Sequence, residues 1–328
     1  MIYAMLPTMQ LGHLQVFAGL PTFRRQPPRR VWCQSTRRAQ DEGGASDQKP
    51  GRPWTARRQG VVAASVAGWV ASGSTSGAAV KSLRRDLVKV ADPETYTALV
   101  YAPDGAAAPL PLLVVLHGAG KNDKDATDLA NPAGEHGGLI PSLLATGKAP
   151  RELTENFAVV APYAAGKKSF YEEPRQKMLR FIDWVCSDAG RAAGTPSVDR
   201  QQIFLFGFSD GATEVMELAS TRRFSGCVVA AYGFTGELPR RACELLKNIP
   251  VWVFHSADDV IFPVSCSDKL VRKLREVNSR DVVRYTRYER DQEGFTGSIR
   301  GHSTGITASR QPELYRWLLE LGPLAPLA

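Results

Sequence analysis

Two hydrophobic patterns alternate along the chain from about residue 86 onward. Short runs of consecutive apolar residues are typical of strands that are covered on both faces of a sheet. Between these runs lie segments whose apolar residues recur at helical spacing. The expected strands are Ala98–Tyr101, Leu112–Leu116, Phe157–Val160, Ile203–Gly207, Cys227–Ala231, Val251–His255 and Val282–Tyr288, and the expected helices are Glu173–Ala189, Asp210–Thr221, Val264–Val277 and Pro312–Leu321.

This alternation predicts an α/β fold with a mostly parallel central sheet and helices on both faces. Residues 121–151 and 163–173 are polar and punctuated by Gly and Pro. Together with residues 233–240, we expect them to form loops at the mouth of a site. Residues 1–80 show no such alternation. We therefore expect a disordered N-terminal segment over 1–80 and one domain over 86–328.

The charge of the chain is divided unevenly between these two parts. Of 41 Lys and Arg and 33 Asp and Glu, residues 1–85 hold 13 bases and three acids, so the remainder has two more acids than bases. The basic character therefore belongs to the N-terminal segment. A nucleic-acid-binding face on the main domain is not supported.

The composition of the N-terminal segment is typical of a targeting sequence. Residues 1–40 contain no Asp or Glu and carry three arginine pairs, as organelle transit peptides do. Arg57–Arg58 then precede an uncharged stretch, 59–80, which resembles a twin-arginine export signal. Together they predict a plastid protein, with the thylakoid lumen as a further destination. Secretion, or a membrane anchor through residues 61–80, is the alternative, although this run has too much Gly and Ser for a typical span.

The five cysteines do not define a site. None stands in a CxxC motif or has zinc-ligand spacing with a histidine, so buried or surface free thiols are expected. The sequence implies no metal and no cofactor.

The strongest chemical motif is Gly207-Phe208-Ser209-Asp210-Gly211, a G-x-S-x-G. An expected strand runs into it and an expected helix follows. A strand, a tight turn and a helix form the geometry of a nucleophile elbow, in which the serine is lifted clear of the sheet. Ser209 is therefore the candidate nucleophile.

An oxyanion hole needs two backbone donors near this serine. The strand at 112–116 ends in His117-Gly118-Ala119-Gly120, the pattern expected of the first donor. We expect the amides of Ala119 and Asp210 to serve, with Gly118 or Gly120 as substitutes for Ala119. His117 itself is interpreted as structural.

A base and an orienting acid should follow the nucleophile in the order Ser, Asp, His. After Ser209 the chain contains two histidines, His255 and His302. His255 ends an expected strand and comes too early to be the base. His302 lies in a Gly-rich loop before the last helix and is the candidate base. The adjacent Asp258 and Asp259 are the candidate acids.

At this point the chain resembles the esterase branch of the α/β-hydrolase superfamily. The similar stretches are LLVVLHGAG, SVDRQQIFLFGFSDG, IPVWVFHSADDVIFPV and GHS…PELYRWLL. They resemble the phospholipase/carboxylesterase, polyhydroxybutyrate-depolymerase-like and predicted-peptidase groups. The family pattern H-G-x-x-D-x-V-x-P implies Asp259 as the acid, with Asp258 as the alternative. Asp210 departs from the family, because relatives often carry Met, Gln or Asn there.

The sequence thus predicts an α/β-hydrolase that cleaves a small-molecule or lipid-like carboxylic ester through an acyl-enzyme, using Ser209, His302 and Asp259. A thioesterase or a serine peptidase could use the same three residues. A catalytically silent hydrolase-like binding protein is the alternative of another class. The sequence leaves open the acyl group, the leaving group and the oligomeric state.

Overall fold

The computed structural model describes most of the chain from residue 87 onward. The described ranges are 87–106, 109–120, 125–166, 169–234, 240–293 and 296–323. The predicted targeting segment, including the uncharged run at 61–80, lies outside them. Within the described ranges, no helix has the length and apolar character needed to cross a membrane.

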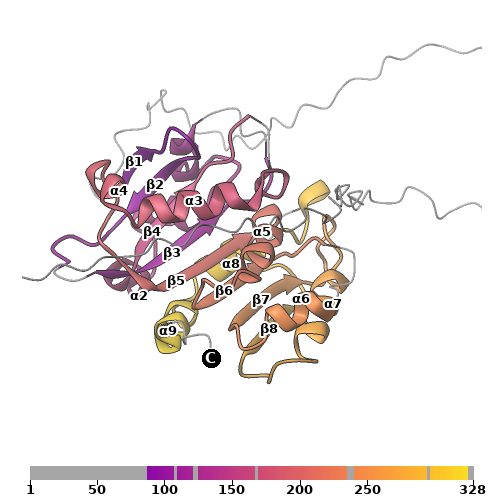
Figure 1. The fold of residues 1–328 in the computed structure, drawn as a ribbon. Helices are drawn as coiled ribbons and strands as arrows, with labels where there is room; N and C mark the ends of the chain where they lie inside the picture. The colour runs from indigo at the N-terminus through magenta and orange to yellow at the C-terminus, as the bar shows by residue number, and fades with distance from the viewer. Residues whose placement is uncertain are drawn as a thin grey trace, which may run out of the picture. The chain divides into compact units, whose positions relative to one another are not determined.

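The described residues form one sheet of eight strands in the order β1-β2-β4-β3-β5-β6-β7-β8 (Figure 1). Pairing is antiparallel between β1 and β2 and between β2 and β4, and parallel elsewhere. The bounds are β1 Leu87–Ala91, β2 Thr97–Tyr101, β3 Leu110–Leu116, β4 Ala158–Pro162, β5 Val198–Phe208, β6 Gly226–Ala230, β7 Val251–Ser256 and β8 Val283–Tyr288. The mostly parallel sheet predicted from the sequence is confirmed.

The first strand was not predicted. β1 lies at the edge of the sheet, and only Leu87 and Val90 of its five residues are buried. An edge strand that buries two residues has neither a continuous apolar run nor a strict alternation, so its hydrophobic signal is weak.

The helices cover both faces of the sheet, as predicted. Their bounds are α1 Ile140–Thr146, α2 Arg151–Asn156, α3 Arg175–Val185, α4 Asp188–Ala192, α5 Asp210–Ala219, α6 Arg240–Leu245, α7 Ser265–Leu274, α8 Thr304–Ser309 and α9 Pro312–Leu321. Three short 3₁₀ helices are η1 Ala126–Ala130, η2 Phe170–Glu172 and η3 Gly297–Ile299.

Two expectations about these segments are wrong. The single helix expected over 173–189 is divided, because Ser187 accepts the amide of Gly190 and caps a new helix, α4. The segment expected as a loop over 121–151 contains η1 and α1, and α2 begins at its end. These helices have only five to seven residues each, too few for an apolar periodicity to be read with certainty from the sequence.

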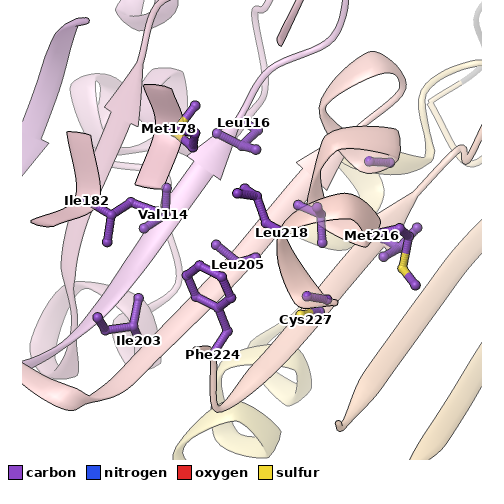
Figure 2. Packing of buried hydrophobic residues seen from close by; sticks show 14 of the residues in the cluster. Val114, Leu116, Met178, Ile182, Ile203, Leu205, Met216, Leu218, Phe224 and Cys227 are labelled. Carbon is purple, nitrogen blue, oxygen red and sulfur yellow. The ribbon is translucent and has the colours of Figure 1, made fainter. Parts of the chain in front are cut away.

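The core lies in two layers, one on each face of the sheet. Along β3, Leu112, Val114 and Leu116 face the layer covered by α3, α5 and α7. Leu113 and Val115 face the opposite layer, covered by α1, α2, α8 and α9. Figure 2 shows part of the first layer, in which side chains of α3 and α5 meet those of β3 and β5. This two-sided packing fixes the ends of β3, β5 and β7, where the candidate residues lie.

Candidate active site

Ser209 occupies a strained turn between β5 and α5. Its φ of 57° and ψ of −115° are unusual for a residue with a side chain. The turn requires close backbone approach on both sides. A Cβ at Gly207 would lie 2.3 Å from the carbonyl oxygen of Gly211, and a Cβ at Gly211 would lie 2.3 Å from that of Leu116. The two glycines of the motif therefore make room for the turn.

Ser209, His302 and Asp259 form a hydrogen-bonded chain. Nε2 of His302 lies 3.0 Å from Oγ of Ser209, and Nδ1 of His302 lies 2.7 Å from Oδ2 of Asp259. Because the carboxylate only accepts, Nδ1 carries the proton and Nε2 is free to accept from the serine hydroxyl. Ser209 is 7% exposed, and the side chain of His302 is 12% exposed. The structure thus brings the three residues together from three distant parts of the sequence.

The carboxylate of Asp259 is fully buried and held from several directions. Its Oδ1 accepts the backbone amides of Ile261 and Phe262 at 2.8 and 2.9 Å. Burial alone would raise the pKa of Asp259, but hydrogen bonds from His255 and His302 outweigh it and lower the pKa to about 2. Asp259 is therefore ionised at neutral pH.

The neighbouring Asp258 faces a different set of partners. Its Oδ1 accepts the hydroxyl of Ser256 at 2.5 Å and the backbone amide of Asp291 at 2.9 Å. Asp258 thus connects the end of β7 to the loop after β8. Of the two adjacent acids, it is Asp259 that contacts His302.

The loop that carries His302 packs tightly against the loop that carries the acid. Gly301 has a φ of 75°, and a Cβ there would lie 2.3 Å from the carbonyl group of Asp258. The rings of Phe208 and Phe262 lie 5.1 and 5.5 Å from the ring of His302. Backbone contact and two aromatic rings therefore restrict the imidazole.

The predicted oxyanion residues lie beside Ser209. A Cβ at Gly118 would lie 3.2 Å from Cβ of Ser209, so the loop after β3 approaches the serine closely. Asp210 is the first residue of α5, and its amide belongs to the first turn of that helix. Ala119 follows Gly118 directly and is exposed. The choice of Ala119, rather than Gly118 or Gly120, as the first donor stays a prediction.

His117 is a buried, neutral imidazole. Burial, together with the neighbouring His136, lowers the pKa of His117 to about 3. Its Nε2 accepts the amide of Ala164 at 3.1 Å, so Nδ1 carries the proton and donates to the carbonyl oxygen of Gly118 at 2.7 Å. His117 thereby links the loop after β3 to the loop after β4.

Sequence reasoning gave His255 no role, yet it contacts the acid. The side chain of His255 is fully buried, and its Nε2 lies 3.2 Å from Oδ2 of Asp259. In the sequence, the H-x-x-x-D spacing that begins at His255 served only to choose Asp259 over Asp258 as the acid. The same spacing, read as a possible contact between the end of β7 and the following turn, could have identified it.

The described residues also contain a surface pocket of about 390 Å³ that lies away from Ser209, His302 and Asp259. It lies between α7 and β8 and is lined by Asp268, Val271, Arg272, Arg275, Glu276 and Tyr285. None of the three linked residues lines it. In the part of the chain that the structure describes, no three His, Cys, Asp or Glu side chains are grouped to hold a metal ion.

Part of the chain is similar in sequence to a known protein family. A family model described as phospholipase/carboxylesterase matches residues 175–294, just over a third of the chain. The matched stretch contains Ser209 and Asp259 and ends before His302. No curated protein sequence matches this chain.

Two solved structures resemble the described fold. The crystal structure of a thermostable esterase is 25% identical, with a TM-score of 0.55, and the alignment covers 73% of this chain and 64% of the esterase. This chain therefore spans slightly less than two thirds of that protein. A putative dienelactone hydrolase from Klebsiella pneumoniae is 18% identical, with a TM-score of 0.50, and the alignment covers 71% of this chain and 98% of that one. At that identity the second likeness concerns the fold alone.

Proposed function

We propose that this chain is a serine hydrolase of the α/β-hydrolase superfamily that cleaves a carboxylic ester through an acyl-enzyme, a proposal that the phospholipase/carboxylesterase family model and the likeness to the thermostable esterase support. The observation that carries the proposal is the chain of contacts from Ser209 through His302 to Asp259, at 3.0 and 2.7 Å. Nucleophile, base and acid in this order are the parts that such a reaction needs.

In the proposed reaction, Oγ of Ser209 attacks the acyl carbon while its proton passes to Nε2 of His302. The tetrahedral adduct collapses, the alcohol leaves with that proton, and the acyl group stays on Ser209. Water then attacks the acyl group with His302 as base, and the carboxylic acid product leaves Ser209. Throughout, the proton stays on Nδ1 of His302, and Asp259 accepts its hydrogen bond and stabilises the imidazolium that forms in each half.

Negative charge on the acyl oxygen needs donors that are already in place. We assign this role to the amides of Ala119 and Asp210. The carbonyl group of Gly118 points toward Nδ1 of His117. Because the N–H of a trans peptide points away from its carbonyl oxygen, the amide of Ala119 points away from the His117 ring. This orientation supports Ala119 as the first donor.

Labelling by a fluorophosphonate tests the proposal. The wild-type protein should be labelled on Ser209, and Ser209→Ala should abolish labelling and lower ester turnover by roughly 10⁴-fold or more. Ser265→Ala, at an exposed position at the start of α7, is the control and should keep both labelling and turnover. Labelling that persists in Ser209→Ala would contradict the assignment of the nucleophile.

The bond type is decided by a substrate panel. Matched short-chain oxygen esters, thioesters and amides differ in the leaving group but share the acyl half, so the ratio of their kcat/KM values reports preference. We expect the oxygen ester to be hydrolysed best. A higher kcat/KM for the thioester or the amide would place the enzyme among thioesterases or peptidases.

The location of the enzyme is a separate proposal that rests on residues 1–80. The acid-free, arginine-paired start and the Arg57–Arg58 signal support import into a plastid, with passage to the thylakoid lumen. A fluorescent reporter fused behind residues 1–80 should enter plastids in a phototrophic cell. A uniform cytosolic signal would contradict plastid import, and a membrane-bound or secreted reporter would favour the alternative reading of residues 61–80.

A further inference from the structure

We propose that His255 is a positioning residue that holds the carboxylate of Asp259 toward His302. The inference rests on the proposed function, because it gives His255 a part in the reactivity of Ser209. His255 touches none of the reacting atoms. It acts through the turn that carries the acid.

The first support is the place of His255 in the fold. It lies near the end of β7, its side chain is fully buried, and it stands four residues before Asp259. Its Nε2 lies 3.0 Å from the carbonyl oxygen of Phe262 and 3.2 Å from Oδ2 of Asp259. One N–H therefore faces both ends of the turn from residue 259 to residue 262.

The second support is the tautomer that the contacts of His255 impose. Both neighbours of Nε2, the Phe262 carbonyl and the Asp259 carboxylate, only accept hydrogen bonds. Nε2 must therefore carry a proton. Nδ1 lies 2.7 Å from Oγ of Ser267, a fully buried hydroxyl that can donate to it. Ser267 thus favours the neutral tautomer in which Nε2–H points at the turn.

The third support is that both carboxylate oxygens of Asp259 have donors beside them. Oδ1 of Asp259 accepts two backbone amides from its own turn, which fix one oxygen. Oδ2 faces the imidazoles of His302 and His255, at 2.7 and 3.2 Å. With donors on both oxygens, rotation of the carboxylate breaks contacts on every side. Without His255, Oδ2 keeps His302 alone, and a buried anion loses part of its solvation.

Two polar substitutions separate positioning from filling of space. In His255→Gln the side-chain amide can place a donor where Nε2 stood, whereas in His255→Asn the shorter side chain places its donor near the Nδ1 position, toward Ser267. We expect the fluorophosphonate to label Ser209 about 10- to 100-fold more slowly in His255→Asn, and His255→Gln to recover much of the rate. In ester turnover, His255→Asn should lower kcat and leave KM within about twofold.

Val253→Ala is the matched control for lost packing. Val253 is fully buried, lies on the same strand and the same face as His255, and belongs to the hydrophobic core. It should lose stability yet keep its labelling rate. Equal rates in the Asn and Gln variants, or rates as fast as that of Val253→Ala, would overturn the positioning role.

A third variant keeps the test decisive where His255→Asn does not fold. Ser267→Ala removes the donor to Nδ1, which is one of the contacts that favour the Nε2–H tautomer, so labelling should slow by a smaller factor than in His255→Asn. An unchanged rate in Ser267→Ala would also overturn the inference. Loss of labelling in Ser209→Ala tests the proposed function separately, since that result does not depend on His255.

Discussion

The carboxylate of Asp210 accepts the backbone amide of Phe170 across 2.9 Å. Asp210 follows the candidate nucleophile directly, and Phe170 begins η2 in the loop after β4. A carboxylate beside an oxyanion would oppose the reaction if it faced the developing charge. The hydrogen bond from the amide of Phe170 instead gives the carboxylate of Asp210 a partner in the loop after β4.

We therefore expect Asp210→Ala to affect stability more than chemistry. The variant loses a charge-assisted hydrogen bond and an acid in the first turn of α5, which should lower the free energy of unfolding by about 1–2 kcal/mol. Its backbone amide remains, so Ser209 should still be labelled by the fluorophosphonate. Asp210→Asn keeps an acceptor and should lose less stability. A labelling rate in Asp210→Ala as low as that of Ser209→Ala would show that the carboxylate itself takes part.

The two adjacent acids should differ sharply in their effect on turnover. Asp259→Asn should keep the fold and lower kcat by up to about 10⁴-fold, because the amide favours the wrong tautomer of His302. Asp258→Asn keeps an oxygen that can accept from Ser256 and Asp291, and should cost far less. The kcat values of both variants on a short-chain aryl ester decide between them. A crippled Asp258→Asn enzyme would refute the assignment of the acid.

Gly301 should tolerate no side chain, because the histidine loop depends on its close approach to the acid loop. Gly301→Ala combines a positive φ with a Cβ that would lie 2.3 Å from the backbone of Asp258, so His302 must move. Gly297→Ala is the matched control, since Gly297 has a φ of 63° in the same loop and no atom within 4 Å of its Cβ position. We expect the labelling rate of Ser209 to be at least about tenfold lower in Gly301→Ala than in Gly297→Ala, because a small displacement of the base slows the reaction. Equal rates in the two variants would show that the close approach is unimportant.

Glu214 makes stability depend on pH. It is buried in α5, and burial, followed by the charges of Glu217 and Asp210, raises the pKa of its carboxyl to about 8. Because this folded-state pKa exceeds the ordinary value of 4.5, the unfolded chain ionises first. The contribution of Glu214 to stability is then lost progressively as pH rises from about 4.5 to 8.

Glu214→Gln removes this ionisation and tests it. The variant should resemble the wild type near pH 4 and gain thermal stability over it as pH rises, with the difference levelling above about pH 8. Thermal midpoints across this pH range measure the effect. Glu94→Gln, at an exposed position, should give a difference that does not vary in this way. A constant difference for Glu214→Gln would mean that the carboxyl is not held neutral.

The strands of the sheet and the turn at Ser209 could be predicted because their signals are local. Consecutive apolar residues in β3, β5, β6 and β7 reflect burial on both faces. At Ser209, the two glycines follow from the tightness of the strand–turn–helix geometry. The edge strand β1 and the short helix α2 were missed because each buries too few residues to leave a clear period. The short helix α1 was missed because its buried residues are consecutive, from Ile140 to Leu144, and show no helical period.

By itself, the sequence determined the alternation of the main strands and helices, the residue that the turn presents, and the two histidines and two acids among which a base and its partner had to be chosen. Only the tertiary structure decided which of these side chains meet. Asp258 and Asp259 are neighbours in sequence but contact different residues, Asp291 and His302, of the connection between β8 and α8. His255, which sequence reasoning had set aside, reaches the acid from the end of β7. The physical reason is that hydrogen bonds and desolvation act over a few ångströms in space. The contact between Ser209 and His302 joins residues 93 positions apart, and it exists only once the ends of several strands have been packed together.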